Sequence, residues 1–243
     1  MTQLSFTAVD IVAEPYAAAP QLTARLRIEE STGATVHAIA LRCQVRIEPQ
    51  RRPYSEADEA ELLSLFGDRS RWRDTLRPFP WMHCGVMVQG FTGTCEVDLP
   101  MPVTYDFEVT GSKYLHAVRD GFVPLLLLFS GTVFTRGNTG FGVEQVGWDC
   151  EASYQLPVSV WQQVIEANFP GTGWLRLDRD VLHALARYQA AHGLTTWDAT
   201  IESLLAVEAS KGDDPLGPPP RAQQHTGARG APTPRAPSEE TVP

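Results

Sequence analysis

The chain has 243 residues, 43% of them hydrophobic, and a formal net charge of −9. A chain of this length can bury a sizeable core, and its negative charge gives no electrostatic reason to bind nucleic acid or an anionic membrane. Four scattered cysteines (Cys43, Cys84, Cys95 and Cys150) and the lack of an export signal predict a cytoplasmic protein with reduced thiols.

The first part of the chain alternates apolar and polar residues, which is typical of half-buried β-strands. This pattern predicts strands over 4–12, 22–29 and 36–48. The turn sequence "ESTGA" joins the last two, so we predict that they pair as a β-hairpin. Further strands are expected over 86–99, in two pieces broken at "QGFTG", and over 104–110, 113–118, 125–135 and 141–148.

The apolar run "VPLLLLF" starts at Val123 and is far too short to cross a bilayer, which needs about 20 apolar residues. It shows no alternation between polar and apolar residues. We therefore expect a central strand that is covered on both faces.

Helical signals interrupt the strands once and then follow them. Ser55 and Asp58 have the spacing of a capping box and predict a helix over about 55–66. Three more helices are expected toward the C-terminus. They begin at Pro157, which is placed as a first helical residue, at Asp178 as an N-cap, and at a capping box formed by Thr195 and Asp198.

These elements predict a mainly β structure with added helices (α+β). We expect an antiparallel β-sandwich of immunoglobulin/C2-like architecture over 1–155, with the inserted helix at about 55–66. A C-terminal helical unit over 156–210 is expected to pack on the sandwich. Residues 211–243, rich in Pro and Gly, are expected to form a disordered tail.

No motif for catalysis, metal or nucleotide binding stands out in the sequence, so we expect no cofactor. The cysteines lack the C-x2-4-C spacing of structural zinc sites. Cys43 and Cys95 fall on apolar strand faces, where a thiol serves as packing material. The alternative is an enzyme whose site is assembled from distant residues around His83, Cys84 and His116.

Two surfaces are candidates for binding a protein partner. The outer face of the predicted hairpin carries Arg25, Arg27, Arg42 and Arg46, which would form either a solvated face with mixed charges or a docking patch for an acidic protein.

The second surface is the segment "RSRWRDTLRPFPWMH". It contains Arg77, Phe79, Trp81 and His83, and its arginines and aromatic residues are of the types enriched in interfaces. These aromatic residues could equally fill an end of the sandwich.

The stretches "EPYAA", "ALRCQVRIEPQRRPY", "GFTGTCEVDLP", "LLLLFSGTVFTRG" and "GWLRLDRD" closely resemble an uncharacterised bacterial family, domain of unknown function 6084. The resemblance covers roughly residues 3–207 and assigns no activity. Genes of this family lie near those of high-affinity nickel–iron hydrogenases, which implies an accessory or assembly role. The absence of paired cysteines and histidine-rich tracts speaks against nickel delivery.

We therefore expect a cytoplasmic, non-enzymatic binding or accessory protein. Its expected partner is a protein, with a hydrogenase subunit or maturation protein as the candidate. Neither nucleic-acid binding nor membrane insertion is expected, and the oligomeric state is left open.

Overall fold

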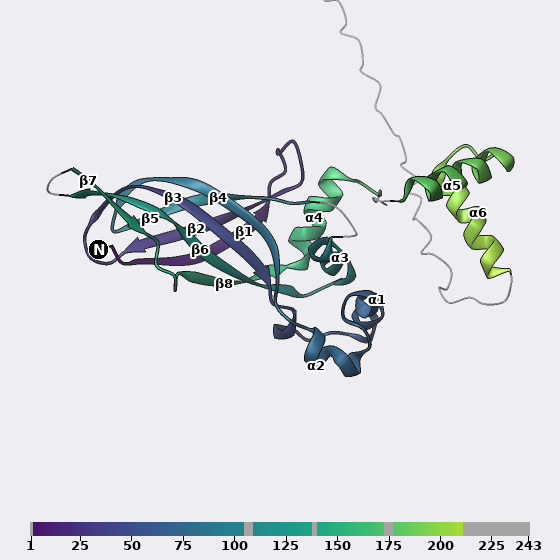
Figure 1. The fold of residues 1–243 in the computed structure, drawn as a ribbon, viewed down its shortest axis with the longest axis horizontal. Helices are drawn as coiled ribbons and strands as arrows, with labels where there is room; N and C mark the ends of the chain where they lie inside the picture. Colours follow the sequence, from purple (N-terminus) through teal and green to yellow (C-terminus); the bar gives the residue numbers. More distant parts are fainter. Residues whose placement is uncertain (1, 105–108, 138–139, 173–176, 211–243) are drawn as a thin grey trace, which may run out of the picture. The chain divides into compact units, whose positions relative to one another are not determined.

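A computed structural model of the protein describes residues 2–104, 109–137, 140–172 and 177–210. Within these residues the chain is a mixed α and β structure with eight strands and six α-helices (Figure 1). The strands are β1 (Leu4–Ala13), β2 (Gln21–Glu30), β3 (Thr35–Ile47), β4 (Phe79–Thr92), β5 (Thr94–Pro102), β6 (Phe122–Gly137), β7 (Gly140–Gln145) and β8 (Glu151–Pro157). The helices are α1 (Glu56–Phe66), α2 (Trp72–Thr75), α3 (Thr110–Ala117), α4 (Val158–Asn168), α5 (Arg179–Ala191) and α6 (Trp197–Ala209).

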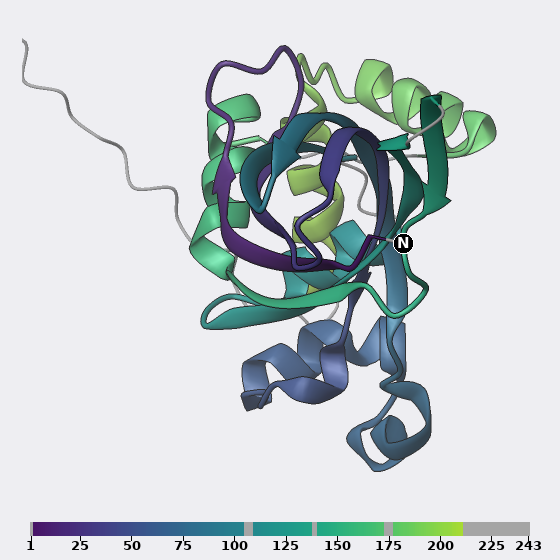
Figure 2. The same ribbon diagram turned by 90° about the vertical axis from the view of Figure 1, so that its left-hand side faces the viewer.

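The strands form two sheets, and every strand pair in them is antiparallel. The first sheet has the order β1-β2-β5. The second has the order β4-β3-β6-β7. Strands β8 and β7 both pair with the edge of β6 that faces away from β3: β8 pairs with its N-terminal half and β7 with its C-terminal half. Figure 2 shows both sheets curving around one interior.

The predicted hairpin between β2 and β3 is wrong, because β2 pairs with β1 and β5 while β3 pairs with β4 and β6. At the end of β2, the Glu30 carboxylate accepts hydrogen bonds from Thr32 N and Oγ1 and from Ala34 N, and this holds the turn that leads into the other sheet. Alternation shows which side chains face the core, but two sheets around one core present the same pattern as a hairpin.

Two further sequence expectations need correction. The predicted strand over 113–118 is instead the second part of helix α3. Tyr114, Leu115 and Ala117 of the helix are buried, and so is Val118, its C-cap. This spacing matches a helical period rather than a period of two. Strand β8 was not anticipated, and most of the predicted strand over 104–110 lies outside the described residues.

Several local signals are confirmed. Ser55 and Asp58 form both halves of the capping box at the start of α1. Helix α4 begins one residue later than expected, with Pro157 as its N-cap. The capping box predicted from Thr195 and Asp198 is wrong by one residue, because Thr196 accepts the hydrogen bond from Ala199 N just before α6 begins.

The core is one cluster of buried apolar residues that both sheets and helices α1, α3 and α4 supply. Leu22, Leu26 and Ile28 come from the first sheet, and Ile39 and Leu127 from the second; all are fully buried. The run "VPLLLLF" is the central strand β6 as predicted, but its side chains alternate, with Leu126 and Leu128 only half-buried. Only one face of β6 is therefore fully covered within the described residues.

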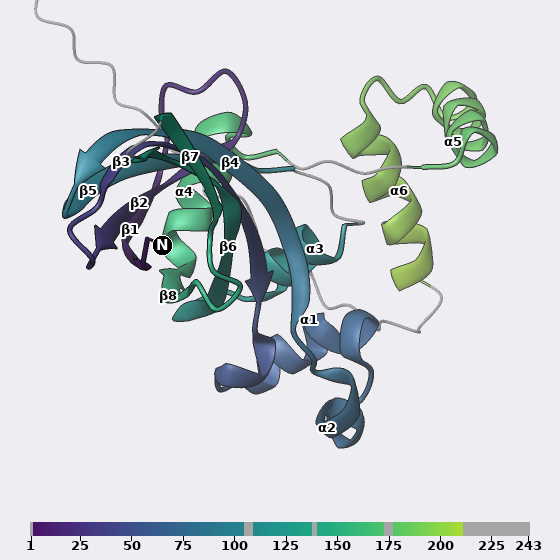
Figure 3. The same cartoon turned by 60° about the vertical axis from the view of Figure 1, so that its left-hand side comes forward.

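The chain divides into two compact units, Met1–Arg176 and Leu177–Pro243. Helix α4 contacts β1 and β8 and belongs to the first unit, whereas the sequence grouped it with the last two helices. Unit 2 contributes α5 and α6 as a helix pair (Figure 3). Among the described residues, no helix combines the length and apolar character needed to cross a membrane.

Candidate functional site

One face of the second sheet combines positive charge with exposed apolar surface. We call it the β3 face; the alternation of each strand and the strand register define its members. They are Ala40, Arg42, Gln44 and Arg46 on β3, His83, Gly85 and Met87 on β4, and Leu126, Leu128 and Ser130 on β6. This face points away from the fully buried residues of the same strands, such as Leu41 and Val45.

Arg42 lies at the middle of the β3 face between two small residues, Gly85 on one side and Ser130 on the other. A Cβ atom at Gly85 would come within 2.7 Å of the Leu41 carbonyl oxygen, so the close approach of the strands requires glycine here. Arg42 is exposed and Arg46 half-buried. Because Gly85 and Ser130 have no large side chains, they do not cover the side chain of Arg42.

The arginines on the two sheets differ in their charge partners. Arg25 pairs with Asp98 at 3.4 Å and Arg27 with Glu96 at 2.9 Å, across β2 and β5. Among the ion pairs of the described residues, none involves Arg42 or Arg46. Within the described residues the β3 face therefore carries two arginines outside any ion pair, with the exposed Glu151 of β8 on the same face beside Leu128.

This arrangement corrects the predicted single patch of four arginines. The patch depended on the β2–β3 hairpin, and the two strands belong to different sheets. Arg25 is consequently separated from Arg42 and Arg46. His83, predicted as part of the other surface, instead shares the β3 face with Arg42 and Arg46, because it lies opposite Gln44.

Apolar side chains border these arginines. Met87, opposite Ala40, is 63% exposed, and further along the same face Val143 of β7, opposite Phe134, is 61% exposed. Leu126 and Leu128 on β6 are half-buried. Accessible apolar groups beside unpaired arginines are a combination found in protein-binding surfaces.

The aromatic residues of the other predicted surface point inward instead. Phe79 is half-buried and meets the Tyr114 ring edge-to-face, with centroids 5.7 Å apart. Trp81 packs edge-to-face on Trp161 with centroids 6.2 Å apart. These rings join β4 to α3 and α4, so their packing fits the alternative in which they fill an end of the structure.

Arg77 precedes this aromatic group and is exposed. Its Nε donates to the Asp74 carbonyl at the end of α2. The contact is local and leaves most of the side chain in solvent. Arg77 thus remains exposed, unlike Phe79 and Trp81 of the same predicted surface.

The structure places two members of the alternative site around His83, Cys84 and His116 on opposite sides of β4. His83 is exposed on the β3 face, whereas Cys84 points to the opposite side of the strand and lies across from buried Cys43. His116 on α3 meets the Trp161 ring edge-to-face at 5.6 Å, and burial lowers its pKa. The described residues contain no group of three metal-ligating side chains.

The two facing thiols influence each other. The Cys84 thiol lies 3.8 Å from the Cys43 carbonyl oxygen. Hydrogen bonding with Cys84, together with burial, raises the pKa of Cys43 above its ordinary value. The buried Cys43 thiol therefore stays protonated and serves as packing, as expected from the sequence, whereas the hydrogen bond with Cys43 lowers the pKa of Cys84.

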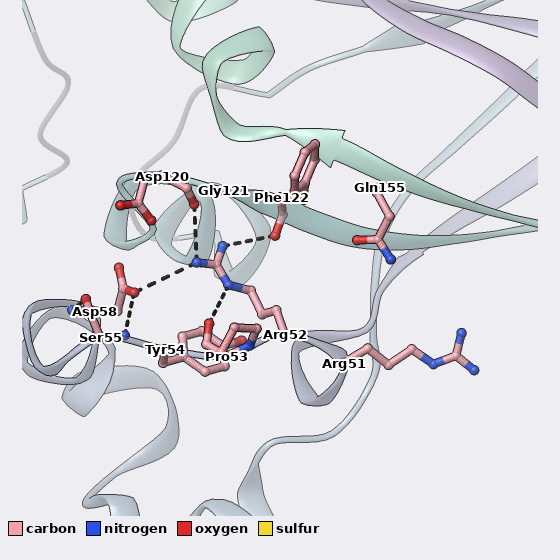
Figure 4. Close-up of a pocket in the computed structure, with 10 residues that line it drawn as sticks. All are labelled: Arg51, Arg52, Pro53, Tyr54, Ser55, Asp58, Asp120, Gly121, Phe122 and Gln155. Carbon is pink, nitrogen blue, oxygen red and sulfur yellow. Dashed lines mark hydrogen bonds and ion pairs between the residues drawn. The ribbon is translucent and has the colours of Figure 1, made fainter.

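A cavity of about 470 Å³ lies where the segment before α1 meets the start of β6 (Figure 4). Its lining consists of Arg51, Arg52, Pro53, Tyr54, Ser55, Asp58, Asp120, Gly121, Phe122 and Gln155. The side chain of Arg52 is only 7% exposed and that of Asp58 only 4%. Buried charges of this kind require partners, which identifies Arg52 as the organising residue.

Arg52 connects three segments (Figure 4). Its Nη1 donates to the Phe122 carbonyl at 3.1 Å, its Nη2 donates to the Asp120 carbonyl at 3.3 Å, and the same Nη2 lies 3.8 Å from the Asp58 carboxylate. The guanidinium also lies 5.0 Å from the centroid of the Tyr54 ring. Because the protein itself already occupies these groups, we interpret Arg52 as a structural clamp rather than an anion site.

Tyr54 extends this network into the core. Its hydroxyl donates to the Pro49 carbonyl at 2.7 Å and lies 2.8 Å from the Tyr114 hydroxyl. Burial raises the pKa of Tyr54 above its ordinary value and that of Tyr114 to about 12. Both phenols therefore stay protonated at neutral pH and act as hydrogen-bond donors.

Comparison with known proteins gives a family. A sequence model described as "Family of unknown function (DUF6084)" matches residues 1–213. The chain belongs to this family. No curated protein matches the chain significantly.

Solved structures give only distant likenesses to this family member. A β-glucosidase from Kluyveromyces marxianus is 9% identical with a TM-score of 0.24, and the match covers 63% of this chain and 15% of that one. β-Glucosidase 3B from Thermotoga neapolitana in complex with α-D-glucose is 15% identical with a TM-score of 0.24, covering 63% and 17%. The chain thus spans under a fifth of these enzymes, and the scores are too low to support an argument about fold or activity.

Sequence reasoning missed the Arg52 cavity. The available signal was the stretch "RRPYSEAD", in which two arginines directly precede a proline and a capping box. The capping box was recognised, but it accounts for only part of what Asp58 does. Its second contact, with Arg52, depends on the tertiary structure.

Proposed function

We propose that this protein is a non-enzymatic cytoplasmic binding protein that uses the β3 face to hold an acidic, partly apolar segment of another protein. The observation that supports this most directly is the accessible Arg42, flanked by Gly85 and Ser130 and without a carboxylate partner among the described residues. On a chain with a net charge of −9, such a local positive surface attracts a partner of opposite sign.

The small side chains at the middle of this face suit an extended or helical segment of a partner. The small residues Ala40, Gly85 and Ser130 leave the strands close to the surface, while Met87 and Leu128 provide apolar contact beside them. Arg42 and Arg46 are four residues apart on β3, an even spacing, and so project from the same face. A partner with two carboxylates about two strand repeats apart, roughly 13 Å, would match them.

We further propose that the two antiparallel sheets form a β-sandwich of immunoglobulin/C2-like architecture. Strands β2 and β3 support this, because they belong to different sheets and yet contribute side chains to the same core. Sandwiches of this kind often present one sheet face to a partner. The first partner to test is a nickel–iron hydrogenase subunit or maturation protein, because the family resemblance implies that association.

The test is quantitative affinity purification of the full chain from its native host. We expect that a stoichiometric partner copurifies with the wild type and that a variant with both Arg42→Glu and Arg46→Glu recovers it at least about tenfold less, because two attractive contacts become repulsive. The matched control reverses Arg25 and Arg27 to Glu on the other sheet and should recover the partner normally.

Far-UV circular dichroism must show that all variants are folded. Equal recovery by the wild type and the Arg42/Arg46 variant would contradict the proposal. A loss confined to the Arg25/Arg27 variant would place the binding surface on the first sheet instead.

A further inference from the structure

The second unit has an apolar surface that it does not bury itself. On α6 the side chains of Trp197, Ile201, Leu204 and Leu205 are 45%, 37%, 37% and 50% exposed. They follow the i, i+4, i+7, i+8 spacing of a single helix stripe. On α5, Val181 and Leu182 are 48% and 42% exposed.

The contact between the two helices uses smaller and more polar groups. The Tyr188 hydroxyl lies 3.0 Å from Ser203 Oγ, and Thr200 is fully buried. The largest apolar side chains therefore lie outside the contact that holds the helix pair together. A pair of 13-residue helices is below the size at which a chain normally sustains its own core, so this stripe needs a covering surface.

The charges of the two helices indicate what covers it. The exposed charged residues of α5 are Arg179, Arg187 and Asp180, which leave an excess of positive charge. Those of α6 include Asp198 and Glu202 and are negative. A twofold dimer requires a self-complementary surface, and a helix pair with one basic and one acidic helix provides that when α5 of one copy faces α6 of the other.

We propose that the α5–α6 pair is a self-association module that joins two copies of this chain into a four-helix bundle. The apolar stripes of both pairs form its interior, and the α5 and α6 charges attract across the twofold axis. This module consists of residues of the second unit, whereas the β3 face consists of residues of the first.

Sedimentation equilibrium of the full chain tests this directly. We expect a dimer for the wild type and a dissociation constant about 100-fold higher for Leu205→Glu, because a twofold interface buries two added carboxylates. The control is Leu63→Glu on α1 of the first unit, a leucine that is also exposed, at 57%, and this variant should dimerise like the wild type.

A charge-exchange experiment keeps the test decisive if Leu205→Glu reduces helicity. Arg187→Glu and Glu202→Arg should each weaken the dimer about fivefold, and an equimolar mixture of the two variants should restore it, because the mixed dimer again pairs opposite charges. Attraction within one chain could not be restored by mixing.

Three results would overturn the proposal. A wild type that stays monomeric at about 100 μM would mean that another surface or another protein covers the stripe. A dimer unaffected by Leu205→Glu would place the interface elsewhere. A mixture no stronger than its two components would refute the pairing of α5 with α6 across the axis.

Discussion

At the scale of single residues, a few buried or nearly buried polar groups hold the connections between elements. Glu30 is the clearest case, because its carboxylate accepts hydrogen bonds from the backbone of Gln3, Thr32 and Ala34 as well as from the Thr32 hydroxyl. These bonds, the Thr32 hydroxyl first among them, lower its pKa from 4.5 to about 2. One carboxylate thus fixes the passage from the first sheet to the second.

We predict that Glu30→Gln destabilises the protein at neutral pH and that this effect disappears in acid. The folded-state pKa lies below the unfolded value, so the stabilisation is complete above pH 4.5 and is lost as pH falls toward 2. Urea unfolding between about pH 7 and about pH 3 measures this difference in the free energy of unfolding.

The matched control is Glu29→Gln, whose side chain is exposed on the adjacent position of β2. It should have little effect at any pH in this range. A difference between wild type and Glu30→Gln that stays constant with pH would show that the carboxylate charge is not responsible.

At the scale of secondary-structure elements, the short helix α3 depends on its contact with β4 more than on its own sequence. Its second residue is Gly111, a poor helix former. A Cβ atom there would lie 2.6 Å from Cδ1 of Trp81. The glycine therefore lets the indole ring rest directly on the helix backbone.

We predict that Gly111→Ala destabilises the protein by about 1–3 kcal/mol, although alanine favours helices, because the added methyl group displaces the Trp81 ring. Thermal or urea unfolding of the full chain measures the change. A double-mutant cycle with Trp81→Leu provides the control: the alanine should cost much less once the ring is absent. An equal cost in both backgrounds would mean that the methyl group does not meet Trp81.

At the scale of the whole molecule, the two sheets of the first unit depend on one core. Leu127 illustrates this, because it lies between Val45 of β3 and Ala152 of β8 and is fully buried in the cluster shared with β2 and β5. A cavity at this position should weaken both sheets together. The second unit, by contrast, leaves large apolar side chains such as Trp197 and Leu205 exposed within its own helix pair.

We predict that Leu127→Ala lowers the free energy of unfolding by about 3 kcal/mol, through lost apolar burial and the cavity left behind. Hydrogen exchange measured by mass spectrometry should become about 100-fold faster in peptides of β2 as well as β6 when exchange requires global opening. Leu63→Ala, at a leucine that is 57% exposed, should change stability by less than about 0.5 kcal/mol. Faster exchange limited to β6 would contradict a shared core.

The sequence predicted local structure where a short segment carries the whole signal. The Ser55–Asp58 capping box and the alternation in β1, β2 and β3 are of this kind, because each depends on neighbours in the chain. Helix α3 was misread as a strand because its eight residues are too few to separate the two periods clearly. At the candidate site, the sequence predicted Arg42, Arg46 and His83 as partner-binding residues. It did not predict that they share one face of the second sheet.

By itself, the sequence determined which side chains of β2 and β3 turn inward, where the first helix is capped, and that Cys43 and Cys95 lie on the core-facing sides of their strands. These properties follow from backbone periodicity and from hydrogen bonds between near neighbours. Only the tertiary structure decided which strands pair, because a strand's edges can bond to any compatible strand and alternation is the same for each choice. That decision separated Arg25 from Arg42, brought His83 beside Arg46, and gave Arg52 its buried partners from a segment about 70 residues further along the chain.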